Sequence, residues 1–160
     1  MLVETYAKYN ARLDFDEPFQ YSTPVVGILT MQNPPQFTDF DYEHFIWEGN
    51  VNMVHYAGSW AVPIRYDLDD AELYPLLDQI NGVLFTGGAM PLVDRETGAL
   101  STYYQTAKKI FNYAKDQKDF KGIEYPILGI CQGLEVLSEL VNNDERLTLS
   151  NVVKYGQSTT

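Results

Sequence analysis

The sequence predicts an α/β fold, a parallel sheet with helices on both faces. Two observations predict it. Short apolar runs recur along the chain, and segments with helical spacing of apolar residues lie between them. Regular alternation of this kind implies parallel strands joined by right-handed crossover connections. The predicted strands are residues 24–30, 60–64, 82–85 and 127–130.

The first strand, residues 24–30, is continuously apolar, as expected for a strand buried on both faces of a sheet. The segment Asn33-Pro34-Pro35 ends it, because proline interrupts regular structure. A helix is predicted over residues 41–56, with Gly58 just beyond its C-terminus.

An acidic cluster, Asp67, Asp69 and Asp70, follows the second strand. It lacks the glycine and the terminal glutamate of a calcium-binding loop. Acidic side chains at the start of a helix complement its dipole, so the cluster is predicted to cap a helix that reaches Leu77. No metal site and no cofactor are therefore expected.

The third strand, residues 82–85, ends in Thr86 and the pair Gly87 and Gly88. Two glycines at the end of a strand let backbone N–H groups approach a ligand. Taken alone, however, these residues are more typical of an ordinary turn. A helix is predicted over residues 99–116.

Cys131, the only cysteine, follows the fourth strand and precedes a helical segment, with Gly129 and Gly133 on either side. This is the layout of a nucleophile elbow. A thiol at a helix N-terminus ionises more readily, and the thiolate is the nucleophile. The N–H group of Gln132 is placed to bind the oxyanion of a tetrahedral intermediate. The alternative is a buried, inert cysteine.

The segment 129–135, Gly-Ile-Cys-Gln-Gly-Leu-Glu, resembles the nucleophile motif of the gamma-glutamyl hydrolases. These are cysteine peptidases of the class I glutamine amidotransferase-like superfamily. The resemblance runs from about Pro24 to about Leu149, and three further segments match in order: residues 24–30, 57–64 and 80–88. It implies a flavodoxin-like three-layer sandwich with Cys131 as nucleophile. The loop at Gly87 and Gly88 would then supply the second oxyanion donor.

The catalytic base is not identified by the resemblance. The family takes its histidine from a later Trp-His-Pro-Glu-like segment, which these 160 residues do not contain. His55 is predicted near the C-terminal end of a helix, at the wrong edge of the sheet. His44 is predicted beside the carboxyl end of the first strand. An exposed, non-catalytic histidine is the favoured interpretation of His44, with a general base as the minor alternative.

The charge of the chain argues against some partners. The net charge is −11 and the isoelectric point is about 4.4, so nucleic acid is not an expected partner. An anionic polyglutamate would need a local basic patch, for which Arg65, Lys108 and Lys109 are candidates. No apolar run is long enough to predict a membrane span.

Residues 1–22 are polar and aromatic and lack the apolar centre of a secretory signal. They are predicted to form an arm laid over a surface. Residues 23–160 are predicted to form one α/β domain that lacks the family's C-terminal part. The family implies a secreted, lysosomal or vacuolar location, which this N-terminus does not support.

Three functions stay open. The first is a gamma-glutamyl hydrolase, in which Cys131 attacks a gamma-glutamyl amide, for example of a folate polyglutamate. The second is a glutamine amidotransferase domain, against which Glu135 speaks because those enzymes usually carry glutamine there. The third is a non-catalytic relative that acts as a structural or interaction subunit, favoured by the missing histidine. In each case another chain or a continuation of this one is expected to complete the sheet.

Overall fold

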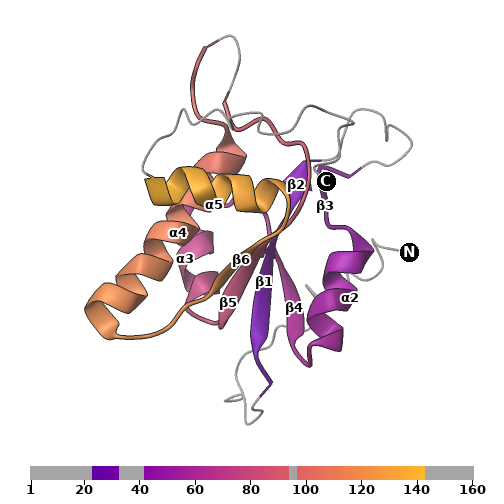
Figure 1. Ribbon diagram of the computed structural model, residues 1–160, viewed down its shortest axis with the longest axis vertical. Coiled ribbons are helices and arrows are strands. Elements are labelled where there is room, and N and C mark those ends of the chain that lie inside the picture. The colour runs from indigo at the N-terminus through magenta and orange to yellow at the C-terminus, as the bar shows by residue number, and fades with distance from the viewer. Residues whose placement is uncertain (1–22, 33–41, 94–96, 143–160) are drawn as a thin grey trace, which may run out of the picture.

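Four parallel strands form the centre of the fold in this computed structural model, which describes residues 23–32, 42–93 and 97–142 (Figure 1). The strands lie in the spatial order β4-β1-β5-β6. Their bounds are β1 (Val25–Leu29), β4 (Trp60–Ile64), β5 (Gly82–Phe85) and β6 (Ile127–Gly129). Counted along the chain, this order is 2-1-3-4, which is the flavodoxin-like arrangement. The predicted fold class is confirmed.

The connections run from β1 outward to β4, then back across β1 to β5 and on to β6. In register, Val26 of β1 lies opposite Ala61 on one side and Gly82 on the other, and Val83 of β5 lies opposite Ile127. The direction in which strands are added to the sheet therefore reverses between β1 and β5: β4 lies on one side of β1, and β5 and β6 lie on the other. Ligands of such sheets bind at the carboxyl ends of the strands near this reversal.

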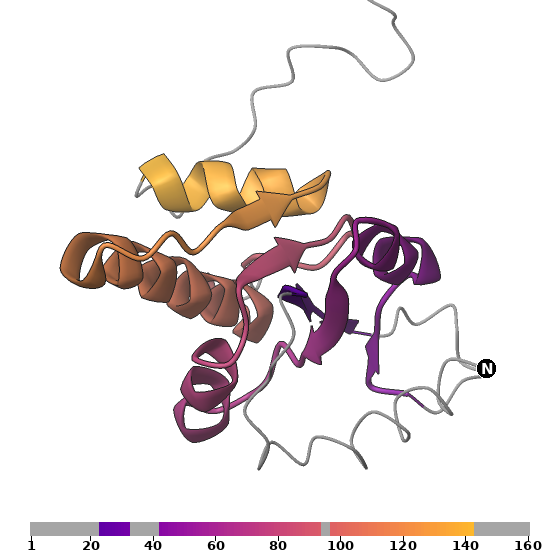
Figure 2. The ribbon, with the colours of Figure 1, turned by 90° about the horizontal axis from the view of Figure 1, so that it is seen from below.

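Helices cover both faces of the sheet (Figure 2). The helix α2 (Glu48–Tyr56) packs on one face, where Val54 joins Ile28, Ala61 and Leu84 in the smaller of two cores. The larger core lies between the other face and three helices, which are α3 (Asp70–Leu77), α4 (Thr102–Lys121) and α5 (Gln132–Asn142). Neighbouring residues of β1 serve different cores, Ile28 the smaller and Leu29 the larger. This explains why the strand is apolar throughout.

The helix predicted over residues 41–56 is wrong in its first part. His44 and Phe45 form the short strand β3 (His44–Phe45), which pairs antiparallel with β2 (Met31–Gln32), and α2 begins only at Glu48. Phe45 packs against the larger core and Ile46 against the smaller one. The antiparallel pairing with β2 therefore takes the place of the first helical turns expected here.

The acidic cluster lies at the start of α3 as predicted: Asp70 is in the first turn, and the N-cap residue is Asp69. Its side chain accepts a hydrogen bond of 2.9 Å from the Glu72 N–H group. Asp67 instead accepts two hydrogen bonds of 3.0 Å from Arg65. The helix predicted over residues 99–116 begins later and runs further, from the cap at Ser101 to Gly122, which has a φ of 66°.

Residues 1–22, predicted to be an arm, and residues 143–160, at the end of the predicted domain, lie outside the described residues. The domain bounds therefore stay a prediction. Within the described ranges, no helix combines the length and the apolar character needed to cross a lipid bilayer.

Candidate active site

Cys131 lies at the corner between β6 and α5, in the left-handed conformation, with a φ of 52°. No other non-glycine residue of the described chain has a positive φ. Such a conformation costs on the order of 1–3 kcal/mol and persists only when neighbouring contacts hold it. Here the Ile130 N–H group donates to Phe85 O at 2.9 Å, and the Leu134 N–H group donates to Cys131 O at 2.9 Å. The strained corner is thus tied to β5 before it and to α5 after it.

The two glycines around Cys131 are needed because backbones approach closely at the corner. A Cβ atom on Gly133 would lie 2.2 Å from the carbonyl oxygen of Phe85. A Cβ atom on Gly129 would lie 2.7 Å from the carbonyl carbon and oxygen of Gly133. Neither position has room for a side chain, so the glycines let the start of α5 rest directly on the end of β5.

The loop of Gly87 and Gly88 reaches the corner, as the sequence predicts. A Cβ atom on Gly87 would lie 3.0 Å from Cys131 Cβ and 3.7 Å from Cys131 Sγ. Gly88 is exposed and so is the Cys131 side chain. The buried cysteine of the alternative interpretation is therefore not what the fold contains. A thiol and a glycine loop face solvent together at the carboxyl edge of the sheet.

The N–H group of Gln132 belongs to the first residue of α5. The N–H groups that follow it are bonded within the first turn, Gly133 to Ile130 O at 2.9 Å and Leu134 to Cys131 O at 2.9 Å. The first N–H groups of a helix have no acceptor within the helix itself, and they favour negative charge. The arrangement can therefore stabilise an anion that forms beside Cys131, although the roles of Gln132 and Gly88 stay predictions.

His44 is neither helical nor exposed, so the interpretation of it as an exposed helical histidine is wrong. It lies in β3 with only 13% of its side chain exposed. Its Nδ1 lies 3.4 Å from Thr30 Oγ1, and its Nε2 lies 3.4 Å from Asp67 Oδ2. Thr30 follows β1 directly, so the predicted position beside the carboxyl end of that strand is correct.

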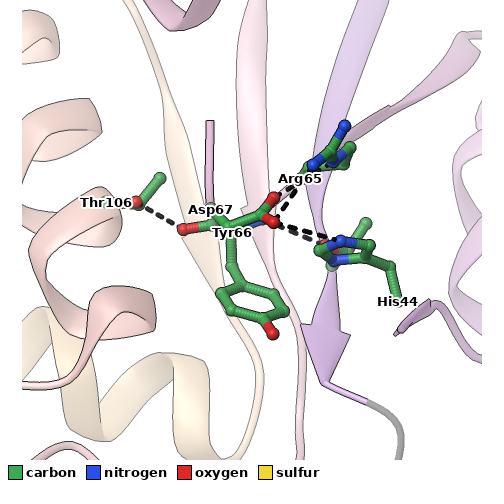
Figure 3. A network of polar contacts seen from close by, with 6 residues as sticks. His44, Arg65, Tyr66, Asp67 and Thr106 are labelled. Atoms are coloured by element: carbon green, nitrogen blue, oxygen red, sulfur yellow. Dashed lines mark hydrogen bonds and ion pairs between the residues drawn. The ribbon is translucent and has the colours of Figure 1, made fainter. Parts of the chain in front are cut away.

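Figure 3 shows that His44 belongs to a polar network with Arg65, Tyr66 and Asp67. The His44 and Tyr66 rings lie 4.8 Å apart between centroids. Thr106 of α4 donates a hydrogen bond to the Tyr66 carbonyl oxygen. The network sits at β1 and β4, whereas Cys131 follows β6, two strand spacings or about 10 Å from β1. Both ring nitrogens of His44 thus face this network.

The other histidine lies at the opposite edge. His55 is in the last turn of α2 and forms an edge-to-face contact with Trp60, at 6.3 Å between ring centroids. Trp60 is the first residue of β4, so His55 is at the amino edge of the sheet, as predicted.

Two of the three candidate cations are paired with carboxylates. Arg65 pairs with Asp67, and its hydrogen bonds lower the pKa of that carboxyl below the usual value. Lys109 pairs with Asp70 at 2.6 Å. Glu43, His44 and Asp67 do bring three possible metal ligands within 4.8 Å of one another. Because Asp67 already accepts both hydrogen bonds from Arg65, this group is better explained as an ion-pair network.

The His44 network predicts a pH dependence of stability. Burial lowers the pKa of His44 below 6.5, and the Asp67 carboxylate opposes that shift. The unfolded chain therefore binds the proton more readily, so the free energy of unfolding rises with pH in this range. The contribution is complete above about pH 6.5 and is lost as the pH falls through the pKa of the folded state.

The variant His44→Asn is therefore expected to flatten the dependence of stability on pH between pH 5 and 7.5. The change in slope is at most about 1.4 kcal/mol per pH unit, the value for one proton. Urea unfolding of the variant and the parent chain at several pH values measures it. An identical slope in His44→Asn and the parent chain would contradict the prediction.

The sequence matches a known protein family and several curated proteins. The protein family described as Peptidase C26 matches residues 24–142. The chain is 38% identical to gamma-glutamyl hydrolase of Rattus norvegicus over 128 residues, 80% of this chain and 38% of that protein. It is 35% identical to gamma-glutamyl hydrolase of Mus musculus, over 78% of this chain and 37% of that protein. Gamma-glutamyl hydrolase B of Dictyostelium discoideum is also 35% identical, over 84% of this chain and 37% of that protein.

The chain thus spans less than two fifths of the length of these curated relatives. Among solved structures, a GMP synthase component from Thermoplasma acidophilum aligns with a TM-score of 0.47 and 18% identity. That alignment covers 76% of this chain and 46% of the other. No conclusion rests on it, because the TM-score is below 0.5.

Proposed function

This chain belongs to the Peptidase C26 family, and we propose that it is the nucleophile-bearing part of a gamma-glutamyl hydrolase. The observation that carries the proposal is the exposed Cys131 thiol, held at positive φ on a strand-to-helix corner beside a glycine loop. A strained residue at the carboxyl edge of a parallel sheet is typical of an active site.

In the proposed reaction, Cys131 Sγ attacks the carbonyl carbon of a gamma-glutamyl amide. A C–S bond forms, and the carbonyl π electrons move to the oxygen. That oxyanion accepts hydrogen bonds from the N–H groups of Gln132 and Gly88. Collapse of the intermediate expels the amine, which takes up a proton, and water then hydrolyses the thioester to release the gamma-glutamyl acid and the thiol.

The glycine at position 87 supports this assignment. A Cβ atom there would lie 3.0 Å from Cys131 Cβ and 3.7 Å from Cys131 Sγ. Gly87 leaves this space open, and the exposed Gly88 follows it. A loop without side chains beside the nucleophile allows backbone N–H groups to come close to the substrate.

We further propose that the base and the rest of the sheet come from outside the described residues, from a continuation or from another chain. In the described part of the chain, β6 pairs only with β5, so its other edge is open. Leu128 of β6 and Leu134 of α5 are more than half exposed beside that edge. An apolar open edge is a feature that proteins normally cover.

A second candidate is a non-catalytic relative that serves as an interaction subunit. The observation in its favour is the position of the two histidines: His44 lies near Thr30 and Asp67, and His55 lies against Trp60 at the amino edge of the sheet, so neither lies beside Cys131. In that case Cys131 would keep its strained geometry without recognising a gamma-glutamyl group.

The test is covalent labelling of Cys131 by a gamma-glutamyl chloromethyl ketone, which needs no catalytic base for turnover. The thiolate forms a C–S bond to the methylene carbon, and chloride leaves. We expect the gamma-glutamyl reagent to label Cys131 at least about tenfold faster than a butyryl chloromethyl ketone, equivalent to about 1.4 kcal/mol of recognition. Mass spectrometry gives the rates, with Cys131→Ser as the blank. Equal rates for the two reagents would refute the hydrolase proposal and favour the interaction subunit.

A further inference from the structure

The side chain of Gln132 makes a two-point contact with the loop that follows β5. Its Oε1 accepts a hydrogen bond of 2.8 Å from the Met90 N–H group, and its Nε2 donates one of 2.6 Å to the Met90 carbonyl oxygen. The two residues are 42 positions apart in the sequence. Gln132 is only 6% exposed, so both hydrogen bonds are shielded from water. The Gln132 amide thus binds both the N–H group and the carbonyl oxygen of Met90.

The same amide lies against Gly88. Its Oε1 would be 3.2 Å from a Cβ atom on Gly88, two residues before Met90. The first residue of α5 therefore touches the glycine loop at Gly88 and binds it at Met90. Gln132 is also the neighbour of Cys131, so one residue joins the nucleophile corner to the loop.

The short strand β2 also contacts the loop. The sulfur of Met31 would be 2.2 Å from a Cβ atom on Gly88, and Met31 is only 2% exposed. The N–H group of Gln32 lies 3.4 Å from the sulfur of Met90. Met31 of β2 and the Gln132 amide thus both contact the loop at Gly88, and both elements also bind Met90.

We propose that the Gln132 side chain is a positioning residue that sets the Gly88 N–H group relative to Cys131. The inference rests on the proposed function, in which Gly88 and Gln132 supply the two oxyanion donors. The backbone of Gln132 supplies one donor directly, and its side chain holds the loop that supplies the other. The distance between the two donors is then controlled by one residue, so both can act on the same oxygen.

The expected effect is specific to reactions that form an oxyanion. A donor misplaced by about 1 Å can cost about a hundredfold in rate, and loss of a donor costs a similar factor. Alkylation by iodoacetamide displaces iodide at a methylene carbon and forms no oxyanion. Labelling by a chloromethyl ketone is assisted when the ketone oxygen is held by hydrogen-bond donors. The two reagents therefore separate donor geometry from the reactivity of the thiol itself.

The experiment compares Gln132→Met with the parent chain. We expect labelling by the gamma-glutamyl chloromethyl ketone to slow about ten- to a hundredfold. Iodoacetamide alkylation is expected to change less than about twofold, since the variant leaves the corner glycines and their backbone contacts in place. Hydrogen exchange of the Met90 amide, followed by NMR, is expected to accelerate because its acceptor is removed.

Two further variants sharpen the test. Gln132→Glu keeps an acceptor for the Met90 N–H group but loses the donor to the Met90 carbonyl, so an intermediate labelling rate is expected. Gln105→Met is the matched control. Gln105 is an exposed glutamine near the start of α4 whose Nε2 donates to the Leu100 carbonyl oxygen at 2.8 Å. Both labelling rates and the Met90 exchange rate are expected to be unchanged in it.

The outcomes distinguish this inference from the proposed function. If the parent chain does not prefer the gamma-glutamyl reagent, the hydrolase proposal fails, and Met90 exchange together with butyryl chloromethyl ketone labelling still tests the positioning role. Suppose instead that the parent prefers the gamma-glutamyl reagent. If the ratio of the chloromethyl ketone rate to the iodoacetamide rate is then the same in Gln132→Met as in the parent, the inference is overturned. Unchanged Met90 exchange in Gln132→Met overturns it as well. An equal loss in both rates also overturns it, since Gln132 would then support Cys131 rather than the loop.

Discussion

Gly133→Ala is expected to destabilise the fold by at least about 3 kcal/mol, at the upper end of overpacking effects. The new Cβ atom would lie 2.2 Å from the carbonyl oxygen of Phe85 and 2.6 Å from its carbonyl carbon. These are backbone atoms of a fully buried central strand, so neither can move without displacing β5 or α5. Domains of this size have only about 5–15 kcal/mol of stability, so a large share would be lost. Urea unfolding followed by circular dichroism measures it.

The matched control is Gly49→Ala. Gly49 is the second residue of α2 just as Gly133 is the second residue of α5, but a Cβ atom there would meet nothing within 4 Å. Alanine in a helix is favoured over glycine by about 0.5–1 kcal/mol, so this variant is expected to be slightly more stable than the parent. Equal unfolding midpoints for the two variants would show that the close approach at Gly133 is not what holds the corner.

The 160 residues alone are expected to show no measurable turnover of a gamma-glutamyl peptide, even though Cys131 can be labelled. General acid–base catalysis contributes about a hundred- to ten-thousandfold to such reactions, and the leaving amine needs a proton. His44 is held between Thr30 and Asp67, and His55 lies at the amino edge of the sheet. Neither histidine is positioned to take the proton of Cys131 or return it to the amine.

Release of the amine product, measured by chromatography, tests this expectation, with Cys131→Ala as the background. Turnover that depends on Cys131 would contradict it. His44→Asn would then identify the base, since His44 is the histidine on the carboxyl edge of the sheet. Loss of that turnover in His44→Asn would mean that His44 leaves its contact with Asp67 during the reaction.

The α/β class, the succession of strands and helices, and the corner at Cys131 were all predictable from local sequence patterns. Each of these depends on features within a few neighbouring residues. Apolar runs without helical spacing become strands, and glycines at positions 129 and 133 permit a sharp turn around the thiol. The cap at Asp69 is equally local, because its partner is three residues away. The family resemblance added the link between the Gly87 and Gly88 loop and Cys131.

The contacts around that corner depend on packing between segments that are far apart in the sequence. His44 and Phe45 form a strand because they pair with β2. Phe45 packs against the larger core, and the next residue, Ile46, packs against the smaller one. The Gln132 side-chain amide binds the backbone of Met90, which lies 42 positions earlier in the sequence. These contacts exist because the crossover connections bring the carboxyl ends of distant strands to one edge. Local periodicity carries no information about which side chains meet there, so sequence patterns predict Cys131 as a nucleophile but not the residues that surround it.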